Sequence, residues 1–153
     1  MAQTTHGLSF FAATVDVSGN NSDWTELEGY GISVAVSGGD RNAGDANTFD
    51  GDTPIVKSGK RTPIDVVVRY VYTEETAASG GAFATVLAQY ETAGGLIYLR
   101  YSPRGYTSDY FEFTTGAAIV TTFKYPQGEA APGDIVDGEF TVRTGALSQG
   151  TVS

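Results

Sequence analysis

The sequence predicts a mainly β protein: a two-sheet β-sandwich or partly open barrel with one short flanking α-helix and a long inter-strand loop. Three observations favour this fold class. Glycine accounts for 20 of 153 residues, about twice the average usage, and it clusters in turns beside threonine, valine, tyrosine and phenylalanine, a composition typical of β proteins. Many segments alternate apolar and polar residues with the period of a strand. Only one segment has helical periodicity.

The predicted strands are segments in which every second residue is large and apolar. In 64–72, for example, the residues Ile64, Val66 and Val68 fall on one face together with Tyr70 and Tyr72. The predicted strands are 8–17, 24–36 with a break near Gly29, 62–73, 96–102, 109–115, 117–125 and 135–144.

The last of these strands separates its side chains most clearly into two faces. The apolar face carries Val136, Phe140 and Val142. The opposite face is polar and carries Asp137, Glu139, Thr141 and Arg143. We therefore expect one face of the sheet to pack against the core and the other to be exposed to solvent.

The one helical segment is 80–93. Its apolar residues are spaced at i, i+3, i+4 and i+7, which gives a single stripe, and Ala93-Gly94-Gly95 ends it. The stripe consists of Phe83, Val86, Leu87 and Tyr90. We expect this stripe to be intramolecular core that covers the outer face of a sheet.

A 25-residue polar segment, 37–61, connects two of the clearest strands, and hairpin connections of this length are normally functional or disordered. Its charge is sorted by sign, because aspartates outnumber Arg41 in its first half and its second half has basic residues but no acidic ones. The glycines favour disorder, whereas Phe49, Ile55 and Val56 favour an ordered arm. Opposite charges would pair within a protruding hairpin or with a neighbouring copy. Both interpretations stay open.

Length and composition indicate a single domain, 1–153, with extended termini at 1–7 and 145–153. There is no cysteine, which excludes a disulfide scaffold and thiol chemistry. The first residues lack the features of a signal peptide or membrane span, so we expect synthesis in a cytoplasm and no membrane partner. The net charge is −9. This sign opposes binding to nucleic acid, because affinity for phosphate needs Lys and Arg.

Candidate catalytic and metal sites are weak. The single histidine, His6, lies near the chain start, and no nucleophile elbow accompanies any serine. Three aspartates of the long segment, Asp45, Asp50 and Asp52, resemble a calcium loop only in composition, because their spacing is not that of an EF-hand. We expect them to be a solvated acidic loop, and we expect no cofactor and no metal.

Two further sets leave binding or hydrolysis open. Asp23, Glu26 and Glu28 are close enough for a carboxylate pair of the glycosidase type. Aromatic residues concentrate around 103–105, where they would form either a sugar-stacking platform or a packed interface. These aromatics are Tyr98, Tyr101, Tyr106, Tyr110 and Phe111.

The order of segments resembles the tail tube protein, or major tail protein, of long-tailed bacteriophages. The resemblance rests on 48–56 (TFDGDTPIV), 59–66 (GKRTPIDV), 68–74 (VRYVYTE), a short helix, 99–103 (LRYSP), a turn at 126–133 and a final strand. It spans roughly residues 8–148. Its motifs are patterns of strand and loop, and none is a catalytic signature.

The resemblance implies a structural virion protein without enzymatic activity. Six copies would form a ring, rings would stack into a hollow tube, and a long loop between two inner strands would reach the adjacent ring. The loop candidates for inter-ring or inter-subunit contact are Arg41, Asp45, Phe49, Asp50, Asp52, Ile55, Val56, Lys57, Lys60 and Arg61.

The resemblance also implies partners and a lumen. The partners would be further copies of the chain and tape-measure, tail-initiation and tail-terminator proteins, in a virion tail assembled in the host cytoplasm. DNA would pass through the lumen without specific binding, and an acidic wall would repel it. The candidates for facing the lumen are Asp137, Glu139, Thr141 and Arg143. Basic residues on predicted strands weaken an acidic lining, namely Arg69, Arg100, Lys124 and Arg143.

Two alternatives come from other classes of protein. One is a carbohydrate-binding β-sandwich module that uses the aromatic segment 101–111. The other is a β-sandwich hydrolase that uses the carboxylates of 23–28. Tubes or rings of purified protein would favour the structural interpretation, and a persistent monomer would favour the other two.

Overall fold

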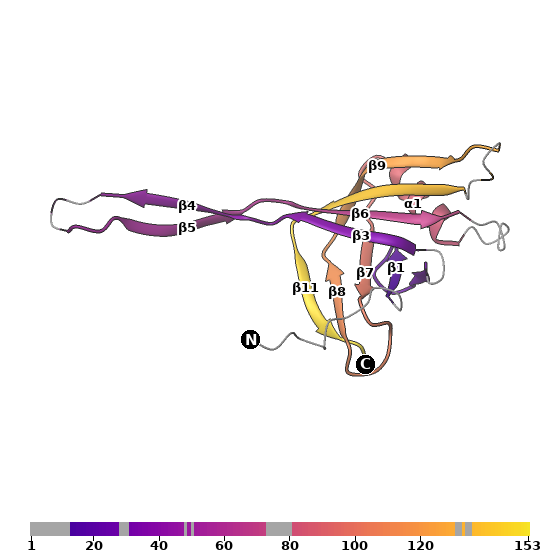
Figure 1. Cartoon of the computed structure of the whole chain (residues 1–153), viewed down its shortest axis with the longest axis horizontal. Coiled ribbons are helices and arrows are strands. Elements are labelled where there is room, and N and C mark those ends of the chain that lie inside the picture. Colours follow the sequence, from indigo (N-terminus) through magenta and orange to yellow (C-terminus); the bar gives the residue numbers. More distant parts are fainter. Residues whose placement is uncertain are drawn as a thin grey trace.

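The computed structural model describes residues 13–27, 31–47, 49, 51–72, 81–130, 133 and 136–153. Their strands form a five-stranded sheet, a four-stranded sheet and a two-stranded arm, with one helix beside the two larger sheets (Figure 1). The mainly β fold class with one short helix is therefore confirmed. No sheet among the described strands is closed into a barrel.

The five-stranded sheet has the order β11-β8-β7-β1-β2, and its neighbouring strands are antiparallel. Its strands are β1 (Thr14–Ser18), β2 (Thr25–Glu26), β7 (Tyr98–Ser102), β8 (Phe111–Thr115) and β11 (Leu147–Thr151). The segment 145–153, expected as an extended terminus, thus contains a strand. Its sequence has no apolar alternation, so its pairing with β8 defines it rather than any local pattern.

The four-stranded sheet has the order β3-β6-β10-β9 and is also antiparallel. Its strands are β3 (Gly31–Gly38), β6 (Ile64–Val71), β9 (Ala118–Gln127) and β10 (Asp137–Thr144). Burial alternates along β6 and β10 as the sequence predicted, so one face of this sheet is core. Val136, expected on the apolar face, lies just before β10 at the end of the sheet and is 40% exposed.

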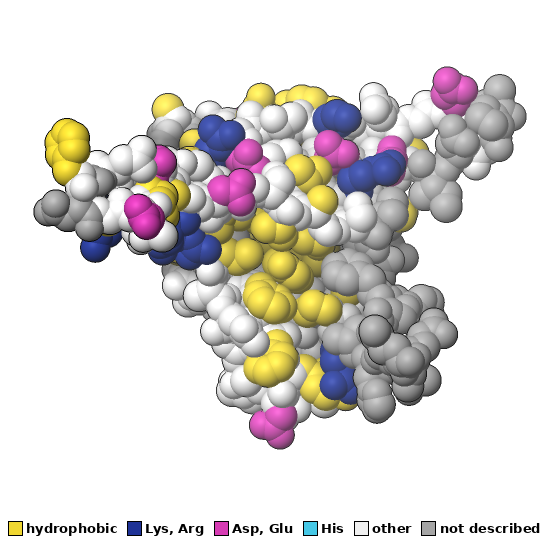
Figure 2. All heavy atoms as spheres, turned by 60° about the vertical axis from the view of Figure 1, so that its left-hand side comes forward, with side chains coloured by type: hydrophobic (Ala, Val, Ile, Leu, Met, Phe, Trp, Pro, Cys, Tyr) yellow, Lys and Arg dark blue, Asp and Glu magenta, His cyan; other side chains and the backbone are white. Residues whose placement is uncertain are grey.

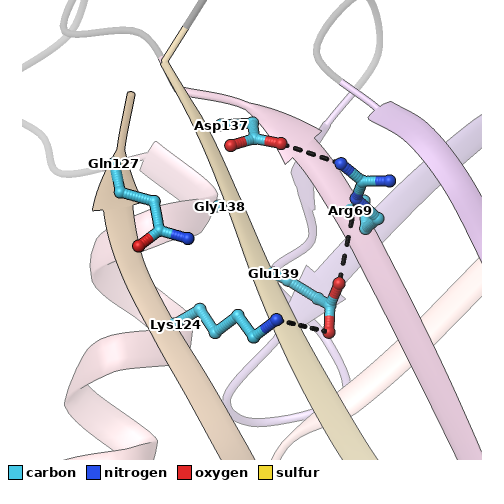
Figure 3. Close-up of a pocket in the computed structure, with 6 residues that line it drawn as sticks. All are labelled: Arg69, Lys124, Gln127, Asp137, Gly138 and Glu139. Carbon is cyan, nitrogen blue, oxygen red and sulfur yellow. Dashed lines mark hydrogen bonds and ion pairs between the residues drawn. The ribbon is translucent and has the colours of Figure 1, made fainter. Parts of the chain in front are cut away.

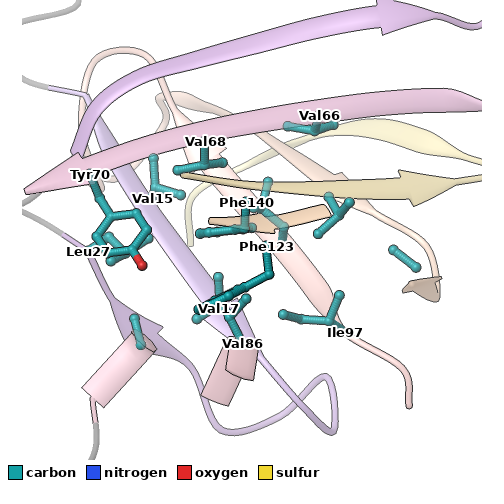
Figure 4. Close-up of a cluster of buried hydrophobic side chains, with 14 of the residues drawn as sticks. Val15, Val17, Leu27, Val66, Val68, Tyr70, Val86, Ile97, Phe123 and Phe140 are labelled. Carbon is teal, nitrogen blue, oxygen red and sulfur yellow. The ribbon is translucent and has the colours of Figure 1, made fainter. Parts of the chain in front are cut away.

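The core fills the space between the two sheets and the helix (Figure 4). Phe140 and Val142 of β10 and Val66 and Val68 of β6 face it from one sheet. From the other sheet come Val15, Val17 and Leu99. Each of these side chains is at most 4% exposed.

Helix α1 (Gly81–Glu91) packs against β9, β1 and β2. Val86 is buried, and Phe83 and Leu87 are partly buried against the core. Tyr90 is 42% exposed, but its ring stacks on Phe123 of β9 with centroids 5.6 Å apart. Three of the four stripe residues therefore pack onto the core, and the fourth lies at its margin.

The segment 37–61 forms an ordered hairpin arm. Its strands β4 (Arg41–Ala46) and β5 (Ile55–Arg61) continue β3 and β6 out of the sheet and project far beyond the rest of the molecule (Figure 1). Backbone hydrogen bonds join arm to sheet, from Gly39 N to Pro63 O at 3.2 Å and from Thr62 N to Asp40 O at 2.8 Å. Gly38 has φ 82°, and a Cβ there would meet the Pro63 carbonyl oxygen, so this corner requires glycine.

Candidate assembly site

The face of the four-stranded sheet that points away from the core is polar. The residues of β10 predicted to share a polar face, Asp137, Glu139, Thr141 and Arg143, all lie on it. Their register partners on β6 and β9 add further charged side chains to the same face (Figure 3). These additions are Asp65, Arg69 and Lys124.

Ion pairs connect these side chains across the strands. Arg143 contacts both carboxylate oxygens of Asp65, at 2.8 and 3.0 Å. Arg69 donates to Asp137 at 2.9 Å and lies 3.8 Å from Glu139, which is also 3.8 Å from Lys124. Three acidic and three basic groups therefore give this face no net charge (−3 + 3 = 0). The acidic surplus of the whole chain, whose net charge is −9, is therefore not concentrated on this face.

The Asp65 carboxylate has a pKa below its ordinary value of 3.8, chiefly because the Arg143 guanidinium donates hydrogen bonds to its charged form. A lowered native pKa means that this pair stabilises the fold fully above the unfolded-state pKa. The stabilisation is lost as the pH falls through the native pKa.

Arg143→Gln is expected to raise the pKa of Asp65 toward 3.8, because the charge-assisted hydrogen bonds are lost. Carboxyl chemical shifts of Asp65 measured by NMR across an acid titration check this. Arg69→Gln is the matched control, since Arg69 pairs with Asp137 and Glu139 and leaves Asp65 alone. An unchanged pKa in Arg143→Gln would contradict the assignment of the shift to this pair.

A shallow depression lies where β9 has a bulge between Lys124 and Gln127, opposite Gly138 of β10 (Figure 3). Gly138 forms part of its lining. A side chain at this position would point toward the core, and its Cβ would lie 2.6 Å from the Tyr70 hydroxyl oxygen. Burial raises the pKa of Tyr70 to about 12. Glycine is thus required here because the buried tyrosine ring occupies the space of a side chain.

Both edge strands of this sheet have a side without a partner strand in the described chain. Among the described strands, β3 pairs only with β6. β9 pairs with β10, apart from a bridge between Ala118 and Ile97 at its first residue. Unpaired strand edges are templates for pairing with another chain.

All the residues predicted to make inter-subunit contacts belong to the arm segment. Those on the described residues are exposed, namely Arg41, Asp45, Phe49, Asp52, Ile55, Val56, Lys57, Lys60 and Arg61. Asp50 lies outside the described residues. The tip residue Phe49 is fully exposed, and Ile55 and Val56 are 48% and 64% exposed. In one copy of the chain these apolar side chains have no cover.

The charged side chains of the arm that the structure describes are not paired with one another. None of the ion pairs in the described chain involves an arm residue. The hairpin instead places Arg41 opposite Arg61, beside Lys60, and the two guanidiniums donate to backbone carbonyls. Like charges opposite each other destabilise a strand pair, so this basic group at the arm base (Arg41, Lys60 and Arg61) favours an acidic surface on another molecule.

The other sequence candidates do not converge on one site. The Tyr101 ring stacks on Phe113, Tyr106 covers Arg100, and Tyr110 lies under Arg104, so these rings are engaged within the fold. Asp23 accepts a hydrogen bond from Asn20, while Glu28 and His6 lie outside the described residues.

The described residues contain no group of three or more His, Cys, Asp or Glu side chains placed to hold a metal. Nor does any helix among them combine the length and the apolar character needed to span a membrane.

The chain therefore combines two packed β-sheets, one flanking helix and a long arm that extends from the four-stranded sheet. Solved structures share this fold. A chain of the PVC sheath-tube complex of an extracellular contractile injection system matches with TM-score 0.62 at 15% identity, covering 97% of this chain and 94% of that one. A chain from the sheath/tube terminator of such a system matches with TM-score 0.64 at 15% identity, over 97% and 100%.

A third match comes from the tail of an empty gene transfer agent particle with C6 symmetry, with TM-score 0.59 and 12% identity over 96% of this chain and 98% of that chain. No protein-family model and no curated protein matches the sequence. The resemblance to phage tail tube proteins is thus confirmed in the fold.

Proposed function

We propose that this chain is the structural subunit of a hollow tail tube, in which six copies form a ring and rings stack to make a channel for DNA. The observation that carries the proposal is the four-stranded sheet. Both of its edges lack a partner strand among the described residues, and two of its strands, β3 and β6, continue into the arm. The edges would serve contacts within a ring, and the arm would serve contacts between rings.

The directions of the strands suit closure into a ring. The sheet has four strands in antiparallel order, so β3 and β9 run in opposite directions. When copies repeat around an axis, β9 of one copy can therefore pair with β3 of the next without breaking the antiparallel alternation. Closure removes exposed edges. The sixfold symmetry of the gene transfer agent tail with the same fold supports a hexamer.

The direction of the arm suits stacking. The arm prolongs β3 and β6 (Figure 1). In a ring whose strands run along the ring axis with the tilt of a barrel, the arm would therefore point out of the ring toward the next ring. Its contact with a different surface of another copy would be heterologous, and such contacts propagate without limit. The arm contacts would include Phe49, Ile55 and Val56.

The polar sheet face, with Asp137, Glu139, Thr141 and Arg143, would line the lumen. Its ion-paired charges give a wall with no net charge and with each cation engaged by a carboxylate. DNA phosphates bind where Lys and Arg replace counterions. A compensated wall would therefore let DNA pass without specific binding, although it does not repel DNA as an acidic wall would.

The tube would belong to a virion tail or a related particle, assembled in the host cytoplasm without a membrane. Its further partners would be tape-measure, tail-initiation and tail-terminator proteins. The subunit would act by self-assembly and have no catalytic role.

An armless variant tests the proposal. Replacing 41–61 with Asn-Gly leaves Asp40 opposite Thr62, which the hydrogen bond from Thr62 N to Asp40 O already joins, and Asn-Gly forms the two-residue turn that such hairpins favour. We expect electron microscopy to show tubes from the wild type, and single rings or unassembled subunits from the folded variant.

A second variant replaces only 47–54 with Asn-Gly, which keeps β4 and β5 but removes Phe49, so it separates the contribution of the tip from that of the arm strands. Circular dichroism confirms that both variants are folded. Full-length tubes from the armless variant would refute the stacking role of the arm. A wild-type protein that stays monomeric at high concentration, with or without tail extracts, would refute the tube itself.

A further inference from the structure

The core-facing side of the four-stranded sheet is uncovered along the β3 edge. Val34 and Val36 are register partners of the buried Val68 and Val66, so they point to the same side as the core. Val34 is only partly buried, and Val36 is 44% exposed. We name this apolar pair the valine strip (Val34 and Val36). Figure 2 shows hydrophobic side chains gathered in the angle between the sheets on this side of the molecule.

The opposite edge of the same sheet has a second uncovered surface. Phe123 of β9 is buried, but its neighbours on the same side are not. Tyr125 is 57% exposed and meets Phe123 edge-on at 5.2 Å, and Tyr90 of α1 is 42% exposed and stacks on Phe123 at 5.6 Å. We name this surface the tyrosine strip (Tyr90, Phe123 and Tyr125).

The two strips cannot cover each other within one copy. β6 and β10 lie between β3 and β9, so the two edges are about 14 Å apart, three strand spacings. Both strips nevertheless lie on the core side of one sheet, each beside an open edge. Pairing of β9 with β3 of another copy would bring one strip against the other.

We propose that the tyrosine strip of one copy packs against the valine strip of the next copy in a ring, so that the apolar layer beneath the sheet continues from subunit to subunit. The partner is a second copy of this chain. The inference rests on the proposed ring and adds the surface that holds its subunits together. Exposed aromatic side chains beside aliphatic ones are the usual composition of a protein interface centre.

One test substitutes a side chain of the valine strip and measures the critical concentration for assembly. Val36→Ser removes an apolar side chain that the interface would bury and is expected to raise the critical concentration for assembly about tenfold. Ala35→Ser is the matched control, because Ala35 is the adjacent residue and a register partner of Val67 on the polar face. Equal critical concentrations for both variants would contradict the proposal.

A second test uses the absence of cysteine from the chain. The double variant Val36→Cys with Tyr125→Cys is assembled and treated with a short bismaleimide, and we expect a ladder of covalent oligomers that ends at the ring size. The control pair Val36→Cys with Lys124→Cys moves one cysteine to the neighbouring residue, whose side chain points to the polar face and Glu139. It is expected to give no ladder.

The outcomes separate this inference from the proposed function. Tubes without a ladder, from this pair and also from the pair Val34→Cys with Tyr90→Cys, would overturn the contact between the strips and leave the tube intact. Wild-type protein that forms neither rings nor tubes would overturn both. If the control pair gives as strong a ladder as the test pair, the inference is also overturned. That result would show that cross-linking does not depend on which face of the sheet carries the second cysteine.

Discussion

Phe140→Ala is expected to lower the free energy of unfolding by about 3–5 kcal/mol, because it leaves a cavity between the two sheets. Phe140 is 2% exposed, pairs with Val68 and Phe123 on the flanking strands, and lies 5.9 Å from the Tyr70 ring. Urea unfolding, followed below the concentration at which subunits assemble, measures the loss without the stabilising effect of assembly.

The same substitution at the arm tip is the matched control. Phe49 is fully exposed in a single copy, so Phe49→Ala should change stability by less than about 0.5 kcal/mol. If the tip is an anchor between subunits, each copy instead loses about 1.5–3 kcal/mol of burial on assembly, and light scattering should show a higher critical concentration. Assembly at the wild-type concentration would show that Phe49 is not an anchor. A stable Phe140→Ala subunit would place the centre of the core elsewhere.

The sequence predicted the strands and helix whose patterns are local. The alternation in β6 and β10 was visible because one face of each strand is core, and the stripe of α1 was visible because Val86 and Leu87 repeat with the helical period. Such periodicity depends only on which side of an element is buried. It therefore holds without knowledge of the partner strands.

Elements defined by distant pairing could not be predicted in this way. β11 has no apolar alternation, and the arm is exposed on both faces, so neither contains a pattern of burial. Sequence reasoning left the arm open between disorder and order. In the structure a continuous ladder with β3 and β6 orders it.

Asp16 shows the same limit inside the core. It lies in a strand expected to be apolar, yet it is buried, because Arg100 reaches it at 2.7 Å from β7. Arg100 is itself held between Trp24 and Tyr106, 4.4 and 4.9 Å from their ring centroids. Arg100 was a candidate basic residue for the lumen, but it lies on the five-stranded sheet and its guanidinium contacts Asp16, Trp24 and Tyr106. No local signal joins residues 84 positions apart.

For the candidate site, the sequence predicted which residues share a face but not their partners. Asp137, Glu139, Thr141 and Arg143 alternate along one strand, so their common face followed from the pleat. The compensation of their charge depends on the register with β6 and β9, which places Arg69 and Lys124 beside Glu139. The net charge of the whole chain therefore does not determine the charge of this face.

Reversing the charge of the arm's basic residues is expected to block tube growth while leaving the subunit folded. Lys57, Lys60 and Arg61 are exposed and belong to no ion pair in the described chain, so their replacement by glutamate costs the fold little. Among the described arm residues the charge would change from +1 (−3 + 4) to −5 (−6 + 1). The arm would then repel the acidic surfaces of a chain whose net charge is already −9.

Each exposed ion pair contributes only about 0–1 kcal/mol, but the contact would be repeated by every subunit of a ring and would fix the register and orientation of stacking. Replacing the same three residues with glutamine separates lost attraction from new repulsion and should slow growth without abolishing it. Adding Asp45→Lys, Asp50→Lys and Asp52→Lys to the glutamate variant should partly restore tubes. The two halves of the arm segment would again carry opposite charges, with their signs exchanged, and could attract each other. Raising the salt concentration should narrow the difference between the variants, because exposed charges are screened. If the glutamate variant forms tubes as long as the wild type at low salt, charge does not direct stacking, and Phe49, Ile55 and Val56 remain as the contacts of the arm.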